Sequence, residues 1–183
     1  MPFFETGIEG LVVYEPKIMH DDRGYFFESY NHRVFEDAGL VFAWVQDNQA
    51  RSTYGVIRGL HYQHEPFAQT KLIRALQGTI LDVVVDIRKE SATYGKTFTI
   101  ELSDDNKRQL LVPRGFAHGY SVLSETAEIL YKCDNFYSKA AEGGIRFDDP
   151  ALGIDWKVPE AEAVLSPKDL VLPVLAEAVN HFV

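Results

Sequence analysis

The chain has 183 residues, a length typical of one domain, so we expect a single domain over residues 1–183. Hydrophobic residues make up 46% and charged residues 25%, as in ordinary globular proteins, and no apolar run is long enough to span a membrane. The formal net charge of -9 argues against nucleic acid as a partner, because such binding depends on basic patches.

Cysteine content and the first residues bear on where the protein works. The single cysteine, Cys133, excludes an internal disulfide and fits a reducing cytoplasm. The first residues have neither the basic region nor the long apolar region of a secretory signal. We therefore expect a cytoplasmic protein.

Helical patterns occur only near the two ends of the chain. Asn31 is a typical cap for a short helix over 32–38, which Gly39 ends. Toward the other end, the run Ser166-Pro167-Lys168-Asp169 is typical of a helix start in which the aspartate closes a capping box. Residues 174–178 also have helical composition. We expect these helices to be short and peripheral.

Strand patterns dominate the middle of the chain. Residues 80–87 are rich in β-branched side chains, and polar and apolar residues alternate over 97–102 and 127–134. Turn signals such as Gly78 and Gly95 separate these segments. Many short strands punctuated by turns predict a mainly β fold, an antiparallel jelly roll with short helices at both ends.

The segment 55–63 places an arginine and a histidine on one predicted strand. By strict alternation Arg58 and His61 would face opposite sides of the sheet. A bulge at Gly59 would turn both side chains inward, toward a site. The alternative is an edge strand with two polar residues on the surface.

Three more polar residues interrupt apolar strands, and two of them allow two interpretations. Lys71 either supplies a fixed positive charge in a pocket or extends to water at the rim of the sheet. His118 is by default a core histidine with its hydrogen bonds satisfied. Asp82 either lies on a solvated face with Asp86 or, if that face is interior, orients a histidine.

Tyr131 lies on the apolar face of its strand. It shares that face with Ala127, Ile129 and Cys133, whereas three of the four residues on the opposite face are charged. The tyrosine face therefore points inward. A buried tyrosine hydroxyl needs a partner, which is either structural or a ligand.

A metal site is not expected. The candidate ligands are His61, His64 and His118. A strand-borne site would favour a His-x-His pair, whose side chains lie on one face, and this pattern is absent.

Together these segments resemble one family, the dTDP-4-dehydrorhamnose 3,5-epimerases, over about residues 2–175. Single runs are weak signals, but their order and spacing together are specific. The runs are Asp22-Arg23-Gly24-Tyr25-Phe26-Phe27-Glu28, Gln46-Asp47-Asn48, Gly55-Val56-Ile57-Arg58-Gly59-Leu60-His61, Lys71, Pro113-Arg114-Gly115-Phe116-Ala117-His118-Gly119, Tyr131-Lys132 and Leu165-Ser166-Pro167-Lys168-Asp169.

The resemblance implies a cupin-like jelly-roll homodimer that works without metal or cofactor. It implies that His61 is a base partnered by Asp169, that Tyr131 is the acid and that Lys71 steadies an enolate. For Asp169 we favour the histidine over the capping box, because one side chain cannot easily serve both. The implied nucleotide-sugar ligands are Arg23, Phe26 and Glu28, which would reach the partner's pocket, and Gln46, Asn48, Arg58, His118, Glu142, Lys168 and Tyr137, the last stacking on thymine.

The implied reaction inverts C3 and C5 of dTDP-4-keto-6-deoxy-D-glucose, giving dTDP-4-keto-L-rhamnose in dTDP-L-rhamnose biosynthesis. Two alternatives stay open. One is a sibling enzyme that inverts a single carbon or moves the carbonyl between C3 and C4. The other is a non-catalytic carbohydrate-binding module, which would not need base, carboxylate and acid together.

Overall fold

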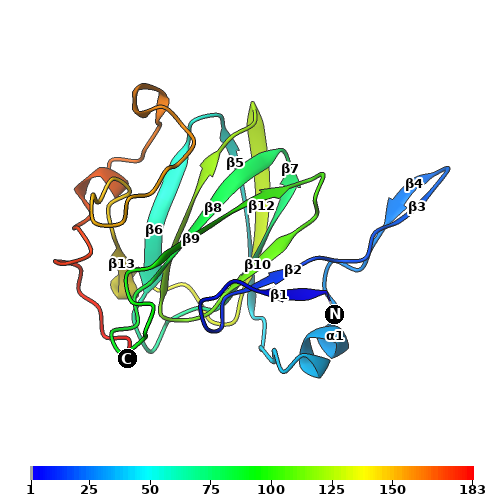
Figure 1. Cartoon of the computed structure of the whole chain (residues 1–183), viewed down its shortest axis with the longest axis horizontal. Helices are drawn as coiled ribbons and strands as arrows, with labels where there is room; N and C mark the ends of the chain where they lie inside the picture. Colours follow the sequence, from blue (N-terminus) through cyan, green and yellow to red (C-terminus); the bar gives the residue numbers. More distant parts are fainter. Residues whose placement is uncertain (1) are drawn as a thin grey trace.

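Two antiparallel sheets face each other in the computed structural model, which describes residues 2–183 (Figure 1). The first sheet has the order β1 (Phe3–Glu5), β2 (Val12–Tyr14), β10 (Gln109–Val112), β7 (Lys71–Gln77), β12 (Thr126–Cys133) and β5 (Gln46–Thr53). The second has the order β13 (Glu142–Gly144), β6 (Ile57–Gln63), β11 (Phe116–Val122), β8 (Thr79–Asp86) and β9 (Thr97–Ser103). The predicted mainly β, antiparallel jelly roll is confirmed.

The remaining elements are short. β3 (Met19–Asp21) and β4 (Gly24–Phe26) form a separate two-stranded ribbon that projects from the body (Figure 1). The one α-helix in residues 2–183 is α1 (His32–Asp37). Three 3-10 turns complete the described chain: η1 (Lys139–Ala141), η2 (Glu160–Glu162) and η3 (Asp169–Val171). Within the same residues, no helix is long and apolar enough to cross a membrane.

The main core lies between the two sheets. Ile73, Ile80, Val84 and Ile129 point into it and are almost entirely buried. Burying one such side chain stabilises the fold by about 1.5–3 kcal/mol. Strand β8 is buried on both faces, because residues 142–183 cover the outer side of its sheet. The C-terminal part of the chain, residues 142–183, therefore forms one wall of the molecule.

The predicted helices differ in outcome. The Asn31 side chain accepts a hydrogen bond from the Arg33 N–H at 3.1 Å, so the predicted cap of α1 is confirmed. Ser166 also accepts from the Asp169 N–H at 3.1 Å, but only the three-residue turn η3 follows, with Lys168 at its N-cap position. Residues 174–178, in contrast, form only a hydrogen-bonded turn, closed by the Ala178 N–H on the Val174 carbonyl. Five residues are too few to sustain a helix without a cap.

A bulge at Gly59 confirms the predicted distortion of β6. Arg58 pairs with Tyr120 and His61 pairs with His118, so two residues of β6 oppose the single Gly119 of β11. The Gly59 φ of +127° lies in the region that only glycine adopts readily. The bulge turns both Arg58 and His61 toward the space between the sheets.

We expect Gly59→Ala to lower the free energy of unfolding by roughly 3 kcal/mol or more, because backbone strain and overpacking each contribute about 1–3 kcal/mol. A Cβ at Gly59 would lie 2.5 Å from the Gly119 Cα. Gly7 is the matched control, since its φ is +79° but a Cβ there meets nothing within 4 Å. Urea denaturation of both alanine variants makes the comparison, and equal losses would contradict the packing argument.

Candidate active site

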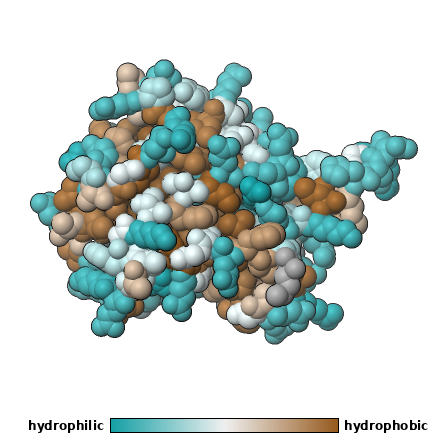
Figure 2. Space-filling model, in the orientation of Figure 1, coloured by the Kyte–Doolittle hydropathy of each residue, from teal (hydrophilic) through white to brown (hydrophobic). Residues whose placement is uncertain are grey.

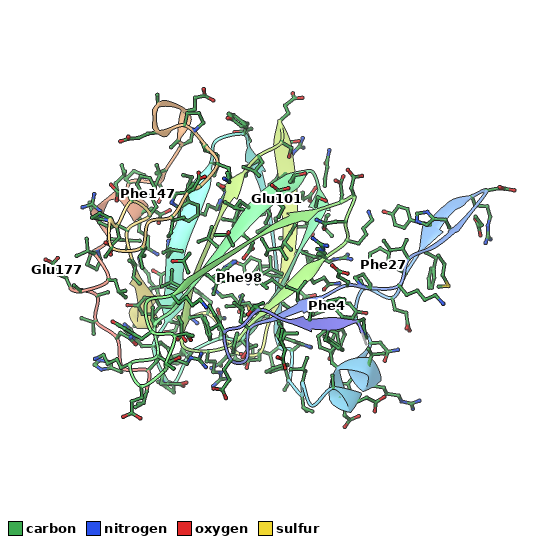
Figure 3. All side chains as sticks on the ribbon, in the orientation of Figure 1. Phe4, Phe27, Phe98, Glu101, Phe147 and Glu177 are labelled. Carbon is green, nitrogen blue, oxygen red and sulfur yellow. The ribbon has the colours of Figure 1, made fainter. Side chains whose placement is uncertain are left out.

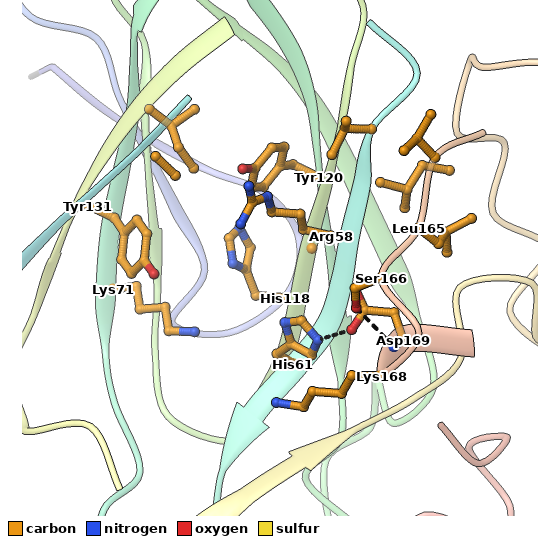
Figure 4. Close-up of a pocket in the computed structure, with 16 residues that line it drawn as sticks. Arg58, His61, Lys71, His118, Tyr120, Tyr131, Leu165, Ser166, Lys168 and Asp169 are labelled. Carbon is orange, nitrogen blue, oxygen red and sulfur yellow. Dashed lines mark hydrogen bonds and ion pairs between the residues drawn. The ribbon is translucent and has the colours of Figure 1, made fainter. Parts of the chain in front are cut away.

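A cavity of about 470 Å³ opens between the two sheets, and the side chains predicted to carry chemistry line it (Figure 4). His61 comes from β6, Lys71 from β7 and Tyr131 from β12, whereas Asp169 enters from η3. These four residues are far apart in sequence but share one cavity. The structure also brings three predicted binding residues to the same lining: Arg58, His118 and Lys168.

His61 and Asp169 form a close pair at the edge of the cavity. The His61 Nε2 lies 2.6 Å from the Asp169 Oδ1, and the carboxylate side chain is only 3% exposed. Burial disfavours the charged carboxylate, but the hydrogen bonds from His61 and Ser166 outweigh it and leave the pKa of Asp169 below its usual value. Asp169 is therefore an anion at neutral pH. It fixes the ring orientation and stabilises a proton taken up by His61.

The other ring nitrogen of His61 is available for chemistry. Within residues 2–183, the His61 Nδ1 makes no hydrogen bond. Figure 4 shows the ring between Asp169 on one side and the cavity on the other. With its side chain 37% exposed, His61 can exchange protons with solvent at the cavity mouth.

Tyr131 presents a buried hydroxyl to the cavity. It lies on the inward face of β12 with Ala127 and Ile129, as the alternation predicted. Burial raises its pKa to about 12, so the hydroxyl keeps its proton at neutral pH. A buried phenol that holds a proton beside an open cavity fits the role of general acid.

Lys71 lies next to Tyr131. Its Nζ is 5.9 Å from the centre of the Tyr131 ring, and the pocket interpretation of this lysine is confirmed. Burial lowers the pKa of Lys71, while Cys133 and Asp82 oppose that shift. A partly desolvated ammonium interacts strongly with an oxyanion placed beside it.

His118 belongs to a second histidine–carboxylate pair. The His118 Nε2 lies 2.9 Å and 3.0 Å from the two oxygens of Asp82, which is completely buried on β8. The interior interpretation of Asp82 is thus confirmed, and the solvated-face alternative is wrong for both Asp82 and Asp86. His118 is satisfied as a core residue and also lines the cavity.

Polar residues surround the mouth of the cavity. A depression of about 270 Å³ continues from it and shares His61, Lys71, Tyr131 and Lys168 with the main cavity. The Lys168 Nζ lies 2.7 Å from the Glu142 Oε2, and the Tyr137 hydroxyl donates to the Glu142 Oε1 at 3.1 Å. The depression thus gathers five predicted binding residues: Gln46, Asn48, Tyr137, Glu142 and Lys168.

Three predicted residues do not reach this cavity within the chain. Arg23 and Phe26 lie on the β3–β4 ribbon, where Arg23 pairs with Asp21 at 2.5 Å and Phe26 is 65% exposed. Glu28 follows the ribbon and accepts a hydrogen bond from Asn31. None of the three lines the cavity or its mouth.

Sequence reasoning missed Tyr120 and Ser166. Tyr120 lines the cavity beside Arg58, and within residues 2–183 its buried hydroxyl has no hydrogen-bond partner. Its position two residues after His118 was a usable signal. In residues 2–183, no three histidine, cysteine or carboxylate side chains lie close enough together to hold a metal ion.

Comparison with known proteins identifies the family of the chain. The sequence model of the dTDP-4-dehydrorhamnose 3,5-epimerase family matches residues 5–177. The chain belongs to this family. The dTDP-4-dehydrorhamnose 3,5-epimerase of Shigella flexneri is 51% identical over 171 residues, which is 93% of each chain.

Solved structures of the family have the same fold. The 3,5-epimerase of Elizabethkingia anophelis superposes with a TM-score of 0.92 at 50% identity and 96% coverage of both chains. An epimerase of Legionella pneumophila in complex with dTDP-4-keto-L-rhamnose gives 0.91 at 44% identity, covering 96% of this chain and 93% of that one. The fold is thus the cupin jelly roll of these epimerases.

A relative with a narrower activity is also similar. The dTDP-4-dehydrorhamnose 3-epimerase of Streptomyces niveus is 36% identical over 173 residues, covering 94% of this chain and 83% of that protein. The family scaffold therefore carries both one-carbon and two-carbon epimerases.

Proposed function

We propose that this chain is a dTDP-4-dehydrorhamnose 3,5-epimerase, which inverts C3 and C5 of dTDP-4-keto-6-deoxy-D-glucose and releases dTDP-4-keto-L-rhamnose. The observation that carries the proposal is the grouping of His61–Asp169, Lys71 and Tyr131 in one cavity. Membership of the family supports the substrate and the reaction. We propose that residues 1–183 form a single jelly-roll domain, which supplies the four residues proposed to carry the chemistry.

The chemistry follows from the ketone at C4, which acidifies the protons on C3 and C5. His61, backed by Asp169, removes one of them, and the negative charge moves to O4 beside Lys71. Tyr131 then delivers its proton to the opposite face of the same carbon. A positioned acid or base accelerates such a step by about 10²–10⁴-fold, and a preorganised oxyanion donor by about 10²–10³-fold.

The polar mouth is suited to the nucleotide. Arg58, His118 and Lys168 supply donors for the diphosphate and the sugar, although the molecule as a whole is acidic. Tyr137 is 56% exposed and presents its ring for stacking on thymine. Gln46, Asn48 and Glu142 supply hydrogen-bonding groups for the rest of the nucleotide-sugar.

The reaction moves protons only, with no net oxidation or reduction, so we propose that it needs neither a cofactor nor a metal. The single cysteine, Cys133, fits work in a reducing cytoplasm.

The deciding experiment incubates the exhaustively chelated enzyme with dTDP-4-keto-6-deoxy-D-glucose in heavy water and follows each carbon by proton NMR. Deuterium and inversion at both C3 and C5 are expected. Label and inversion at C3 alone would instead establish the sibling activity, which the Streptomyces niveus relative favours. Binding without any label would indicate a carbohydrate-binding module. Activity restored only by added metal would overturn metal independence.

We further propose a homodimer in which the ribbon completes the partner's site. Figure 2 shows hydrophobic residues at the ribbon's base, and Figure 3 places Phe4 and Phe27 on the same side of the molecule. Phe4 is 50% exposed and Tyr25 is 56% exposed. An exposed apolar surface of this kind is typical of a protein–protein interface, and a second copy of the chain would bury it.

Subunit complementation tests the shared site. His61→Ala and Arg23→Ala should each be nearly inactive alone, because each spoils every site of its own dimer. When the two variants are refolded together, mixed dimers hold one site with both changes and one with neither, so about a quarter of all sites should recover. No recovery, or an active monomer in sedimentation at assay concentration, would contradict the shared site.

A further inference from the structure

Residues 179–183, named here the floor segment, lie outside the region matched by the family model. The segment passes from Tyr62 on β6 to Ile87 and Lys89, which follow β8, and ends at the lower end of the molecule (Figure 1). One of its residues, Phe182, lines a small void together with Lys71 and His118, on the side of these residues away from the mouth of the cavity.

Four hydrogen bonds hold the floor segment in place. The Tyr62 hydroxyl donates to the Val179 carbonyl at 2.6 Å, and the Asn180 amide donates to the Ile87 carbonyl. The Asn180 Oδ1 accepts from the Phe182 N–H at 2.9 Å, and the Phe182 carbonyl accepts from the Lys89 N–H at 3.1 Å. The Asn180 side chain is almost fully buried and has its hydrogen bonds satisfied, so it fixes the floor segment to the body of the protein.

These hydrogen bonds place the Phe182 side chain against the second sheet. Its ring packs edge-on against Tyr62, with centroids 6.3 Å apart, and it joins the core cluster on the outer side of the second sheet. The Phe182 Cβ also lies 3.6 Å from the position a Cβ would take on Gly115. The ring therefore lies between the second sheet and solvent.

Only a small void separates Phe182 from the catalytic side chains. This void measures about 10 Å³, and Phe182 lines it together with Lys71 and His118, which also line the main cavity. A space of that size holds at most a single water molecule. With the ring removed, the void would widen toward solvent and bring water to the rear of Lys71.

We propose that Phe182 is a positioning residue that closes the floor of the active site and keeps the rear of Lys71 dry. The inference rests on the proposed function, in which Lys71 stabilises the enolate oxygen. An ammonium that is shielded from water stabilises the enolate oxygen more strongly than a hydrated one. Phe182 touches no substrate and acts only through Lys71.

The test compares Phe182→Ala with the wild-type enzyme. We expect kcat to fall by about 10-fold while KM stays within about 2-fold, because water weakens a transition-state contact without removing it. The alkaline side of the kcat profile should also move to higher pH. Burial lowers the pKa of Lys71, so hydration raises that pKa and the ammonium persists further into the alkaline range.

No other titratable group near Lys71 is expected to move the alkaline side of the kcat profile to higher pH. The pKa of Tyr131 is about 12, above the range in which a lysine with a lowered pKa loses its proton. The titratable and charged groups that share a hollow with Lys71 or shift its pKa are Asp82, His118, Arg58, His61, Tyr62, Lys168, Asp169, Tyr120, Tyr131, Tyr137, Glu142 and Cys133. Of these, Tyr62 and His118 also line the void that Phe182 closes. Burial raises the pKa of Tyr62 to about 12, so hydration would move its titration to lower pH, opposite to the shift expected for Lys71.

Val183→Ala is the matched control, since Val183 is 76% exposed in the same segment and should keep wild-type kcat and pH profile. If Phe182→Ala does not fold, Phe182→Val replaces it, with the fold checked by thermal unfolding. Wild-type kcat and an unmoved alkaline limb in the folded variant would overturn the floor role. A wild-type enzyme that exchanges no protons would instead refute the proposed function, so the two failures are distinct.

Discussion

His61→Ala should abolish deuterium exchange at both C3 and C5 while leaving dTDP binding nearly intact. One base serves both carbons in the proposed mechanism. His118 forms a similar pair with Asp82, but its side chain is 9% exposed, against 37% for His61, so His61 is the more accessible base. Loss of a positioned base costs about 10²–10⁴-fold in rate. Proton NMR in heavy water measures the exchange, and isothermal titration with dTDP measures the binding.

Asp169→Asn should cost less than His61→Ala, because the base remains although it is less well oriented and lacks the stabilising charge. His32→Ala is the matched control, since His32 is an exposed residue of α1, remote from the cavity lining. Substantial exchange at either carbon in His61→Ala would reveal a second base. His118, paired with Asp82, would then be the residue to change next.

Tyr131→Phe should separate proton removal from inversion. The variant loses only the hydroxyl and keeps the ring that packs with Ala127 and Ile129. His61 can still form the enolate and can return a proton on its own face. Deuterium should therefore enter the sugar from heavy water while the configuration stays largely unchanged. Proton NMR of the recovered sugar nucleotide scores exchange and inversion separately at each carbon.

The fold should survive this change, because one hydrogen bond contributes about 0.5–1.5 kcal/mol net. Tyr120→Phe is the comparison variant, since it removes another buried hydroxyl from the same cavity. It should keep the wild-type ratio of inversion to exchange. A wild-type ratio in Tyr131→Phe would show that Tyr131 is only a packed tyrosine, and a lowered ratio in Tyr120→Phe would identify the acid instead.

Local patterns predicted those parts of the site that depend on a single strand. Alternation along 127–134 was enough to point Tyr131 inward, because charged residues mark the opposite face. Gly59 was enough to suggest the bulge that turns Arg58 and His61 to the same side. Such features follow from the period of two and from glycine's freedom at positive φ, which are both local properties.

Features that depend on distant segments could not be predicted from the residues alone. Asp82 and Asp86 looked like a solvated face, and only the packing of the first sheet over β8 makes that face interior. Asp169 meets His61 across 108 positions of sequence, and the resemblance rather than any pattern linked them. The floor segment carries no motif, and its relation to Lys71 appears only in the folded chain.

The placement of positive charge also determines which anions the protein can attract. Arg58, Lys71 and Lys168 lie along one cavity, whereas the chain as a whole carries a net charge of -9. At physiological ionic strength a charge is felt over only about 8 Å, so these cations act on molecules that enter the cavity and not on those passing outside. We expect a slender nucleotide-sugar to enter, and a duplex or a folded RNA to be held outside by its size and by the net negative charge of the chain. Shape and screening together thus act as a filter, and we expect the enzyme to remain free for its small substrate amid a large excess of polymeric phosphate.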